Sequence, residues 1–200
     1  MSPHEEKIQR TTQRIIKMVK DDDSIGHCRI NIINGKKEVF NKYKEVLNEI
    51  QCDLISVRFY NSHDELQEDL FNDPLFMSPD WFNLFVFNLG KNGKAMRQEM
   101  VGVEVVTHEL QKKFDSKYYS TLIVSDIAPE KISEKFESET GEKCPISNKR
   151  YLHYDFSALE ILEYLNKILH THSNQFLSKW ADALKKLESL QEQPLKVSNL

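Results

Sequence analysis

The sequence lacks several features that would assign a chemical activity directly. It has only three cysteines, Cys28, Cys52 and Cys144, without a C-x-x-C pair, so we expect neither a disulfide framework nor a cysteine zinc site. No apolar run approaches the roughly 20 residues that cross a bilayer. The start MSPHEEKIQRTTQR has no apolar signal core. We therefore expect a soluble, intracellular protein that does not contact membranes.

Glycine-rich phosphate-binding turns are also lacking. The turn after the first predicted strand reads NGKKE, with one glycine and without the G-K-[ST] of Walker-type ATPases. Walker-type ATP hydrolysis is therefore not expected. The stretch GKNGK at 90–94 is interpreted as a strand-to-helix turn, because such turns are far more common than anion-binding nests.

The charge balance excludes nucleic-acid binding through the field of the whole chain. Lys and Arg number 27 against 31 Asp and Glu, which gives a formal net charge of −4. Phosphate contacts would have to come from a local basic patch. The candidate cations stand at the two ends of one predicted helix: Lys91, Lys94 and Arg97, then Lys112, Lys113 and Lys117.

What the sequence does contain is an alternation of short apolar runs with segments of helical periodicity. The runs are CRINII, LISVRFY, FNLFVFNL, STLIVS and KRYLHYDF. Such alternation predicts parallel strands joined by crossover helices. We therefore expect a three-layer α/β fold with a mostly parallel, five-stranded sheet and flanking helices, and the strand order stays open.

Local signals mark several helix boundaries. Ser62 and Glu65 have the spacing of a capping box, which predicts a helix start. Pro129 is expected in the first turn of a later helix that stops at Gly141. Apolar residues at helical spacing also predict a long helix over 96–114.

The chain is expected to have three parts. Residues 1–25 hold an amphipathic helix and an acidic turn, residues 26–172 form the α/β domain, and residues 173–200 hold a second amphipathic helix with a trailing end. The apolar stripe of this last helix could pack on the sheet or on another protein. It comprises Phe176, Leu177, Trp180, Leu184 and Leu187.

The expected carboxyl ends of the strands show no catalytic pattern. They carry Asn88, Ser125, Asp126 and Asp155, without a histidine at a spacing that would define a triad or a metal cage. We therefore predict no catalytic residue, no metal site and no cofactor.

Three successive stretches resemble the catalytically inactive small partners of the XPF family of structure-specific endonucleases. They are FNLFVFNLGKNGKAMRQEMVGVEVVTHELQKKF, STLIVSDIAPEKISEKFESETGEK and KRYLHYDFSALEILEYLNKIL, within a resemblance that covers about Cys28 to Leu169. An active XPF nuclease carries the metal-binding string G-D-x-n-E-R-K-x-x-x-D, which this sequence does not contain. The resemblance therefore implies an XPF-nuclease-like but inactive domain.

The resemblance also implies partners and a location. Members of this kind pair with a larger XPF-like protein, such as a Zip-type crossover factor of meiosis and sporulation, and the pair binds branched DNA in the nucleus. The family's C-terminal hairpins hold phosphate with glycines, but Ser173 to Gln191 contains none. The resemblance thus favours partner contact through Phe176, Trp180 and Leu184, and leaves DNA contact to the basic residues around the long helix.

Two alternatives stay open. NIINGKKEVFNKYKEVLNEI, HDELQEDLFNDPLF and FNLFVFNLGKNGK are also similar to the first domain of the clamp-loader delta subunit, a nucleotide-free AAA+ module. A flavodoxin-like small-molecule enzyme is the third possibility, with its site at the carboxyl ends of the strands. That enzyme would have a deep polar pocket at Asn34, Asn88 and Asp126.

Overall fold

The computed structural model describes most of the chain between its first residue and the end of the last helix. The described ranges are 1–21, 25–33, 54–73, 76–78, 80–89, 97–147, 149–153 and 158–171. They form the elements α1 (Pro3–Asp21), β1 (His27–Ile33), β2 (Ile55–Tyr60), α3 (His63–Asn72), β3 (Trp81–Asn88), α4 (Arg97–Lys113), the 3₁₀ turn η1 (Ser116–Tyr118), β4 (Tyr119–Ser125), α5 (Pro129–Thr140), β5 (Tyr151–His153) and α6 (Ala158–Thr171).

The strands form one five-stranded sheet in the order β2-β1-β3-β4-β5. All four strand pairings are parallel, which confirms the predicted α/β class and makes the sheet wholly parallel. Because β1 lies between β2 and β3, sheet growth reverses direction at the β1–β3 pair. This pair is the topological switch point, where open parallel sheets most often bind ligands at the carboxyl ends of their strands.

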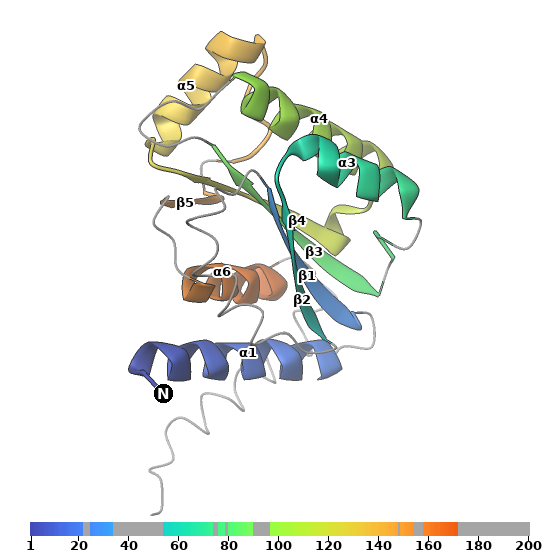
Figure 1. Ribbon diagram of the computed structural model, residues 1–200, viewed down its shortest axis with the longest axis vertical. Coiled ribbons are helices and arrows are strands. Elements are labelled where there is room, and N and C mark those ends of the chain that lie inside the picture. Colours follow the sequence, from blue (N-terminus) through green and yellow to red (C-terminus); the bar gives the residue numbers. More distant parts are fainter. Residues whose placement is uncertain are drawn as a thin grey trace, which may run out of the picture.

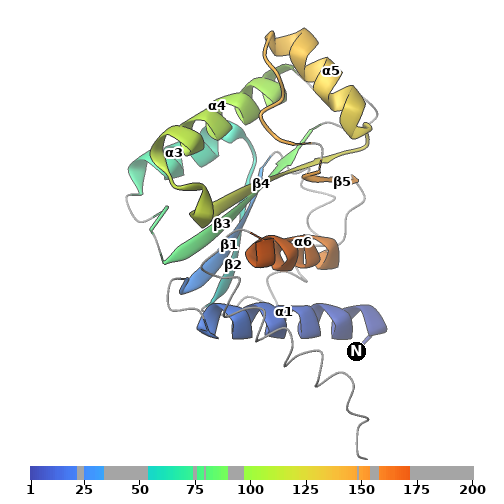
Figure 2. The ribbon, with the colours of Figure 1, turned by 180° about the vertical axis from the view of Figure 1, so that it is seen from behind.

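Helices cover both faces of the sheet, as the three-layer prediction requires. Figure 1 shows α1 and α6 on one face and α3, α4 and α5 on the other, and the reverse view agrees (Figure 2). Each helical layer closes its own apolar cluster against the sheet. The three central strands β1, β3 and β4 are therefore buried on both sides, as parallel strands usually are.

Alternation along the strands divides the core between these two faces. In β1, Cys28, Ile30 and Ile32 join the apolar cluster beneath α1 and α6. In β3, Phe85 and Phe87 join the cluster beneath α3, α4 and α5. Each fully buried side chain of this size stabilises the fold by about 1.5–3 kcal/mol relative to an exposed one.

The N-terminal helix α1 belongs to this core. Its residues Ile8 and Ile15 are 1% and 0% exposed and lie in the same apolar cluster as β1 and α6. Within the described ranges, no helix has both the length and the apolar character needed to cross a bilayer. The amphipathic helix expected within residues 173–200 lies outside the described residues.

The capping signal at Ser62 works in a modified form. The Ser62 hydroxyl accepts a hydrogen bond from the Glu65 amide at 3.3 Å, as predicted. The Glu65 carboxylate, however, accepts from the Asn61 amide at 2.6 Å instead of from Ser62. The Glu65 carboxylate thus bonds to the residue before the N-cap, and α3 still begins where the sequence indicated.

The boundaries of α5 are as predicted. The helix begins at Pro129 and ends before Gly141, which has a positive φ of 79°. A left-handed residue of this kind suits glycine because it has no Cβ to clash with the backbone. Ile132 and Phe136 are buried on the inner side of the helix.

Gly102 in α4 has a packing role that the sequence did not reveal. A Cβ at this position would lie 2.4 Å from Cγ of His63 in α3. That distance is far inside van der Waals contact, so the two helices can approach this closely only with glycine here. A glycine, although it has low helix propensity, therefore permits the contact between α3 and α4 at this position.

Candidate functional site

The carboxyl ends of β3 and β4, together with the start of the neighbouring strand β5, carry a set of polar side chains that we call the carboxyl rim. It comprises Asn88, Ser125, Asp126 and Tyr151. Asn88 and Ser125 end neighbouring parallel strands, so their side chains lie at the same edge of the sheet. Asn88 ends β3, which is one of the two strands at the switch point. The carboxyl rim is therefore where a sheet of this kind most often binds a ligand.

Most polar atoms of the carboxyl rim hold strand ends together. The Asn88 amide nitrogen donates to the Ile33 carbonyl at the end of β1, at 2.8 Å. The Ser125 hydroxyl donates to the Leu89 carbonyl at 2.9 Å and accepts from the Ile127 amide at 3.2 Å. These bonds tie β1, β3 and β4 to one another just beyond the last ladder pairs.

Tyr151 of β5 completes this arrangement. Its hydroxyl contacts the carbonyl oxygens of Ser125 and Ile127, the latter at 2.6 Å. Burial raises the pKa of this phenol, and the nearby Asp126 charge raises it further. A phenol that stays protonated and bonded to backbone carbonyls serves the fold and is poorly suited to act as a base.

One rim atom keeps unused hydrogen-bonding capacity. Asn88 is 2% exposed, and its side-chain oxygen has no hydrogen-bond partner within the described part of the chain. Asp126, beside it, is half-buried at the end of β4. Of the polar pocket expected for an enzyme, the structure places Asn88 at the end of β3 and Asp126 just after the neighbouring strand β4, and Asn34 lies outside the described residues.

No grouping of histidine, cysteine, aspartate and glutamate within the described ranges could hold a metal ion. Cys28 is buried inside the sheet, and Cys144 is half-buried after α5. Burial raises the pKa of the Cys144 thiol, which keeps it in the unreactive protonated form. Neither thiol is placed as a nucleophile.

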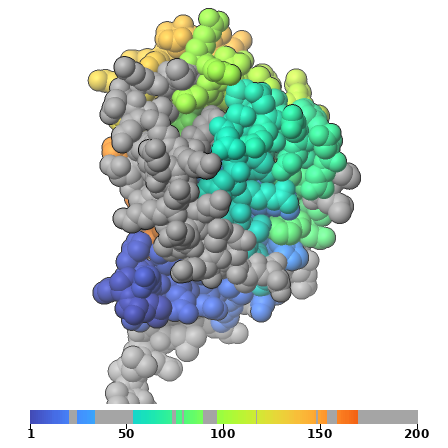
Figure 3. Space-filling model, viewed as in Figure 1, coloured from blue at the N-terminus to red at the C-terminus, as the bar shows by residue number. Residues whose placement is uncertain are grey.

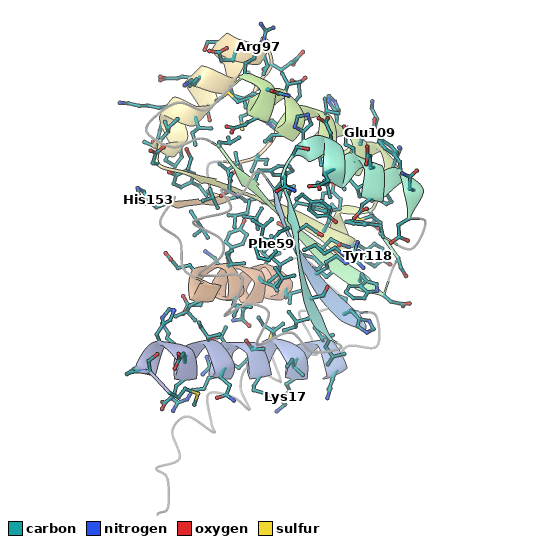
Figure 4. The ribbon with its side chains drawn as sticks, in the orientation of Figure 1. Lys17, Phe59, Arg97, Glu109, Tyr118 and His153 are labelled. Atoms are coloured by element: carbon teal, nitrogen blue, oxygen red, sulfur yellow. The ribbon has the colours of Figure 1, made fainter. Side chains whose placement is uncertain are left out.

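The predicted DNA-binding cations are only partly within the described residues, which exclude Lys91 and Lys94. Arg97, Lys112 and Lys113 are exposed on α4. Figure 4 shows Arg97 near one end of this helix and Glu109, one turn before Lys113, toward the other. At 1.5 Å per residue, Arg97 and Lys113 are separated by roughly 24 Å along the helix axis. The two cations therefore do not belong to one continuous basic patch.

Lys113 already has partners in the fold. Its ammonium lies 2.9 Å from the Glu109 carboxylate and 4.1 Å from the centre of the Phe71 ring in α3. The hydrogen bond from Lys113 lowers the pKa of Glu109. Of the predicted cations on α4, Lys113 is therefore the least available to a phosphate.

A polar band lies on the side of the sheet that faces α3, and sequence reasoning did not identify it. It consists of Arg29 and Asn31 in β1, Arg58 in β2 and Asn83 in β3. Arg29 pairs in register with Asn83, and Asn31 with Arg58. The available signal was the alternation in CRINII, where the polar residues Arg29 and Asn31 stand two positions apart within an otherwise apolar strand.

Arg29 is a buried cation without an ion-pair partner among the described residues. Its side chain is 5% exposed, and its guanidinium carbon lies 4.2 Å from the Trp81 ring centre and 4.7 Å from that of Phe76. It also donates to the Phe76 carbonyl at 3.0 Å. Burial lowers the pKa of Arg29, and the like charge of Arg58 adds to that effect. Two aromatic faces and a carbonyl thus replace the usual carboxylate.

The outer end of the polar band opens into a shallow groove of about 370 Å³ at the edge of the sheet. There Arg58 lies 3.4 Å from Asp69, and the Tyr60 hydroxyl donates to the same carboxylate at 2.9 Å. Burial raises the pKa of Tyr60 to about 12. Glu65 and Glu68 also line this groove, so its charge disfavours a phosphate ligand.

The five residues predicted to contact a partner, Phe176, Leu177, Trp180, Leu184 and Leu187, lie outside the described residues. Comparison of the chain with protein-family models, curated proteins and solved structures finds no match. Functional inference therefore rests on the residues and their geometry.

Proposed function

We propose that this chain is a noncatalytic, XPF-like subunit that pairs with a larger XPF-like protein and helps it to bind branched DNA in meiotic crossover formation in the nucleus. The observation that carries the proposal is that polar side chains of the carboxyl rim form hydrogen bonds within the fold. Three polar side chains at the edge where parallel α/β sheets usually do chemistry, Ser125, Asn88 and Tyr151, donate to backbone carbonyls in or just beyond neighbouring strands.

This arrangement is what a binding subunit would need and a catalyst would not. A nucleophile or general base requires an atom free to exchange a proton with the substrate. The Ser125 hydroxyl both donates and accepts a backbone hydrogen bond. Activating it would break the link between the β3 and β4 ends.

The order of elements further supports the proposal. The three stretches that resemble the XPF-like partners contain β3 with α4, β4 with α5, and β5 with α6. Each is a strand followed by a helix that returns to the sheet, as the resemblance implies. DNA contact would come from helix-borne cations, of which Arg97 and Lys112 are exposed.

Identification of partners tests this proposal most broadly. We would express the tagged chain in its own cells and identify copurifying proteins, then reconstitute the leading complex from pure components. Recovery of a larger XPF-like protein that forms a one-to-one complex supports the proposal. Recovery of a ring-shaped clamp with loader ATPases would instead favour a function like that of the clamp-loader delta subunit.

A variant sharpens the partner experiment. Trp180→Ala alters the apolar stripe predicted from the sequence and should weaken the reconstituted complex by about tenfold or more, as aromatic interface anchors do. Phe71→Ala is the matched control, because Phe71 is an exposed aromatic on α3. If both variants bind the partner equally well, the predicted stripe is not the interface.

The strand order favours one second candidate, a small-molecule site. The order β2-β1-β3-β4-β5 is that of flavodoxin-like proteins, which bind ligands at the β1–β3 switch point. The unpartnered Asn88 oxygen lies at this point. Thermal unfolding with flavin mononucleotide or ATP tests it, since a ligand at 100 times its Kd would add about 2.7 kcal/mol of stability.

A further inference from the structure

The exposed side of α1 carries four cations that form a single stripe. Lys7, Arg10, Arg14 and Lys17 recur at intervals of three, four and three residues, which places them along one face of the helix. All four side chains are exposed. We propose that this stripe, which we call the α1 basic face, binds the sugar–phosphate backbone of DNA.

Part of this positive charge is left uncompensated. Lys7 pairs with Glu163 of α6 at 3.0 Å, and Arg10 has a long 3.8 Å contact with Glu6. Such exposed pairs contribute at most about 1 kcal/mol, so a phosphate can replace the carboxylate. Arg14 and Lys17 form no ion pair with any residue in the described ranges.

The cations border a groove that offers more than charge. The groove between α1 and α6 has a volume of about 550 Å³ and is lined by the cations Lys7, Arg10 and Arg14, by the carboxylates Glu6 and Glu163, and by Asn166. The cations outnumber the carboxylates, so the groove keeps a net positive charge. The side-chain oxygen of Asn166 is buried and has no hydrogen-bond partner within the described residues. Because this oxygen is buried, we assign the phosphate contacts to the guanidinium groups of Arg10 and Arg14, which are exposed and donate hydrogen bonds to phosphate oxygens.

The length of the stripe matches the spacing of phosphates. Lys7 and Lys17 are ten residues apart, which is about 15 Å along a helix. One strand of duplex DNA carries a phosphate about every 3.4 Å of axis, so roughly four phosphates span that length. The stripe is therefore long enough to reach several phosphates of the duplex.

The same face is poorly suited to a lipid surface. Interfacial helices bind membranes by inserting their apolar side. In α1 that side is already buried, since Ile8, Ile15 and Val19 are at most 4% exposed and pack into the core. Figure 3 shows α1, in blue, at the surface of the molecule, and Figure 4 shows Lys17 pointing away from the sheet.

This inference deepens the DNA-binding half of the proposed function, on which it rests, and assigns it to α1. It does not depend on the partner. The α1 basic face has four cations in a continuous row along one helix, whereas the described cations of α4 stand at its two ends.

The test uses the full chain alone and a fluorescent four-way DNA junction, titrated at several salt concentrations. The variant is Arg10→Gln with Arg14→Gln and Lys17→Gln. Three lost phosphate contacts should lower the slope of log K against log salt by roughly 2–3 and the affinity by at least about tenfold. Because all three side chains are exposed, thermal unfolding should stay unchanged.

A charge-matched control is available on the opposite side of the sheet. Lys131→Gln with Lys143→Gln and Lys149→Gln removes the same charge from exposed positions in α5 and the segment that follows it. This control should retain the wild-type salt slope. Equal losses in the two triple variants would show that only bulk charge matters, and would overturn the inference.

Further outcomes of these experiments would also decide whether the α1 basic face binds DNA. Binding to phosphatidylserine vesicles with no binding to the junction would overturn the inference in favour of a membrane. Loss of junction binding in the α1 variant, with the partner complex still forming by size exclusion, supports it. If the chain binds DNA through α1 but no XPF-like partner exists, the proposed function fails and this inference survives.

Discussion

The side-chain amide of Asn88, at the end of β3, donates a 2.8 Å hydrogen bond to the carbonyl of Ile33, at the end of β1. These residues are 55 positions apart in the chain and meet at the switch point of the sheet. The bond closes the place where a parallel α/β sheet usually opens toward a ligand. It is the clearest case of a rim side chain that serves the fold.

Removal of this bond should destabilise the sheet. Asn88→Ala leaves the Ile33 carbonyl without its side-chain donor, and we expect a loss of about 1–3 kcal/mol in the free energy of unfolding. Chemical denaturation measures it. Asn72→Ala, at an exposed position of α3, is the control and should change stability by less than about 0.5 kcal/mol. If Asn88→Ala left the free energy of unfolding unchanged, the hydrogen bond would be dispensable and the carboxyl rim would be free for another role.

The contact between α3 and α4 gives a second prediction. Gly102→Ala places a methyl group 2.4 Å from Cγ of His63, and should cost about 1–3 kcal/mol through overpacking. His63→Ala should relieve the clash, so the double variant should be more stable than Gly102→Ala alone. A double-mutant cycle by thermal unfolding measures the coupling. Strict additivity of the two changes would contradict this packing.

The phenol of Tyr60 predicts a pH dependence. Burial raises its pKa to about 12, above the value near 10 of an unfolded chain. The unfolded state therefore loses this proton first, so the stabilisation is complete below about pH 10 and falls as the pH rises from about 10 to 12, by up to roughly 2–3 kcal/mol. Denaturation at a series of pH values should show a shallower decline for Tyr60→Phe. Identical declines would rule out this assignment.

The buried Arg29 gives a fourth prediction. Arg29→Ala removes the packing between Trp81 and Phe76 and the donor to the Phe76 carbonyl, so we expect a loss of about 3 kcal/mol. Arg29→Met keeps the volume without burying a charge, and should lose about 1 kcal/mol or less. Urea unfolding compares the two. If Arg29→Met loses as much stability as Arg29→Ala, the positive charge itself is needed at that position.

The secondary structure could be predicted from the sequence because its signals are local. Alternating apolar runs identified the strands, and Ser62, Pro129 and Gly141 marked helix boundaries that the structure confirms. The wholly parallel sheet follows from the same alternation of strands and helices. The strand order could not be derived, since nothing local states that β1 lies between β2 and β3.

The site was harder to predict because its properties depend on contacts between distant residues. Asn88 and Ser125 look like candidate active-site residues in the sequence, and only their neighbours across the sheet show that their donors are engaged. The burial of Arg29 was hidden for the same reason, since its partners Trp81 and Phe76 lie about 50 positions away. The role of Gly102 was hidden as well, because the contact that requires a glycine is made with His63 of another helix.

The central claim is that this chain contributes contacts to a DNA-binding complex and leaves its ligand chemically unchanged. The most direct measurement is titration of a labelled four-way junction, in Mg²⁺, with the larger XPF-like partner alone and with the reconstituted complex. We predict that the chain tightens junction binding by about tenfold or more, equivalent to roughly 1.4 kcal/mol, and that the isolated chain leaves the DNA intact. Unchanged affinity on adding the chain, or strand cleavage by the chain alone, would contradict the account.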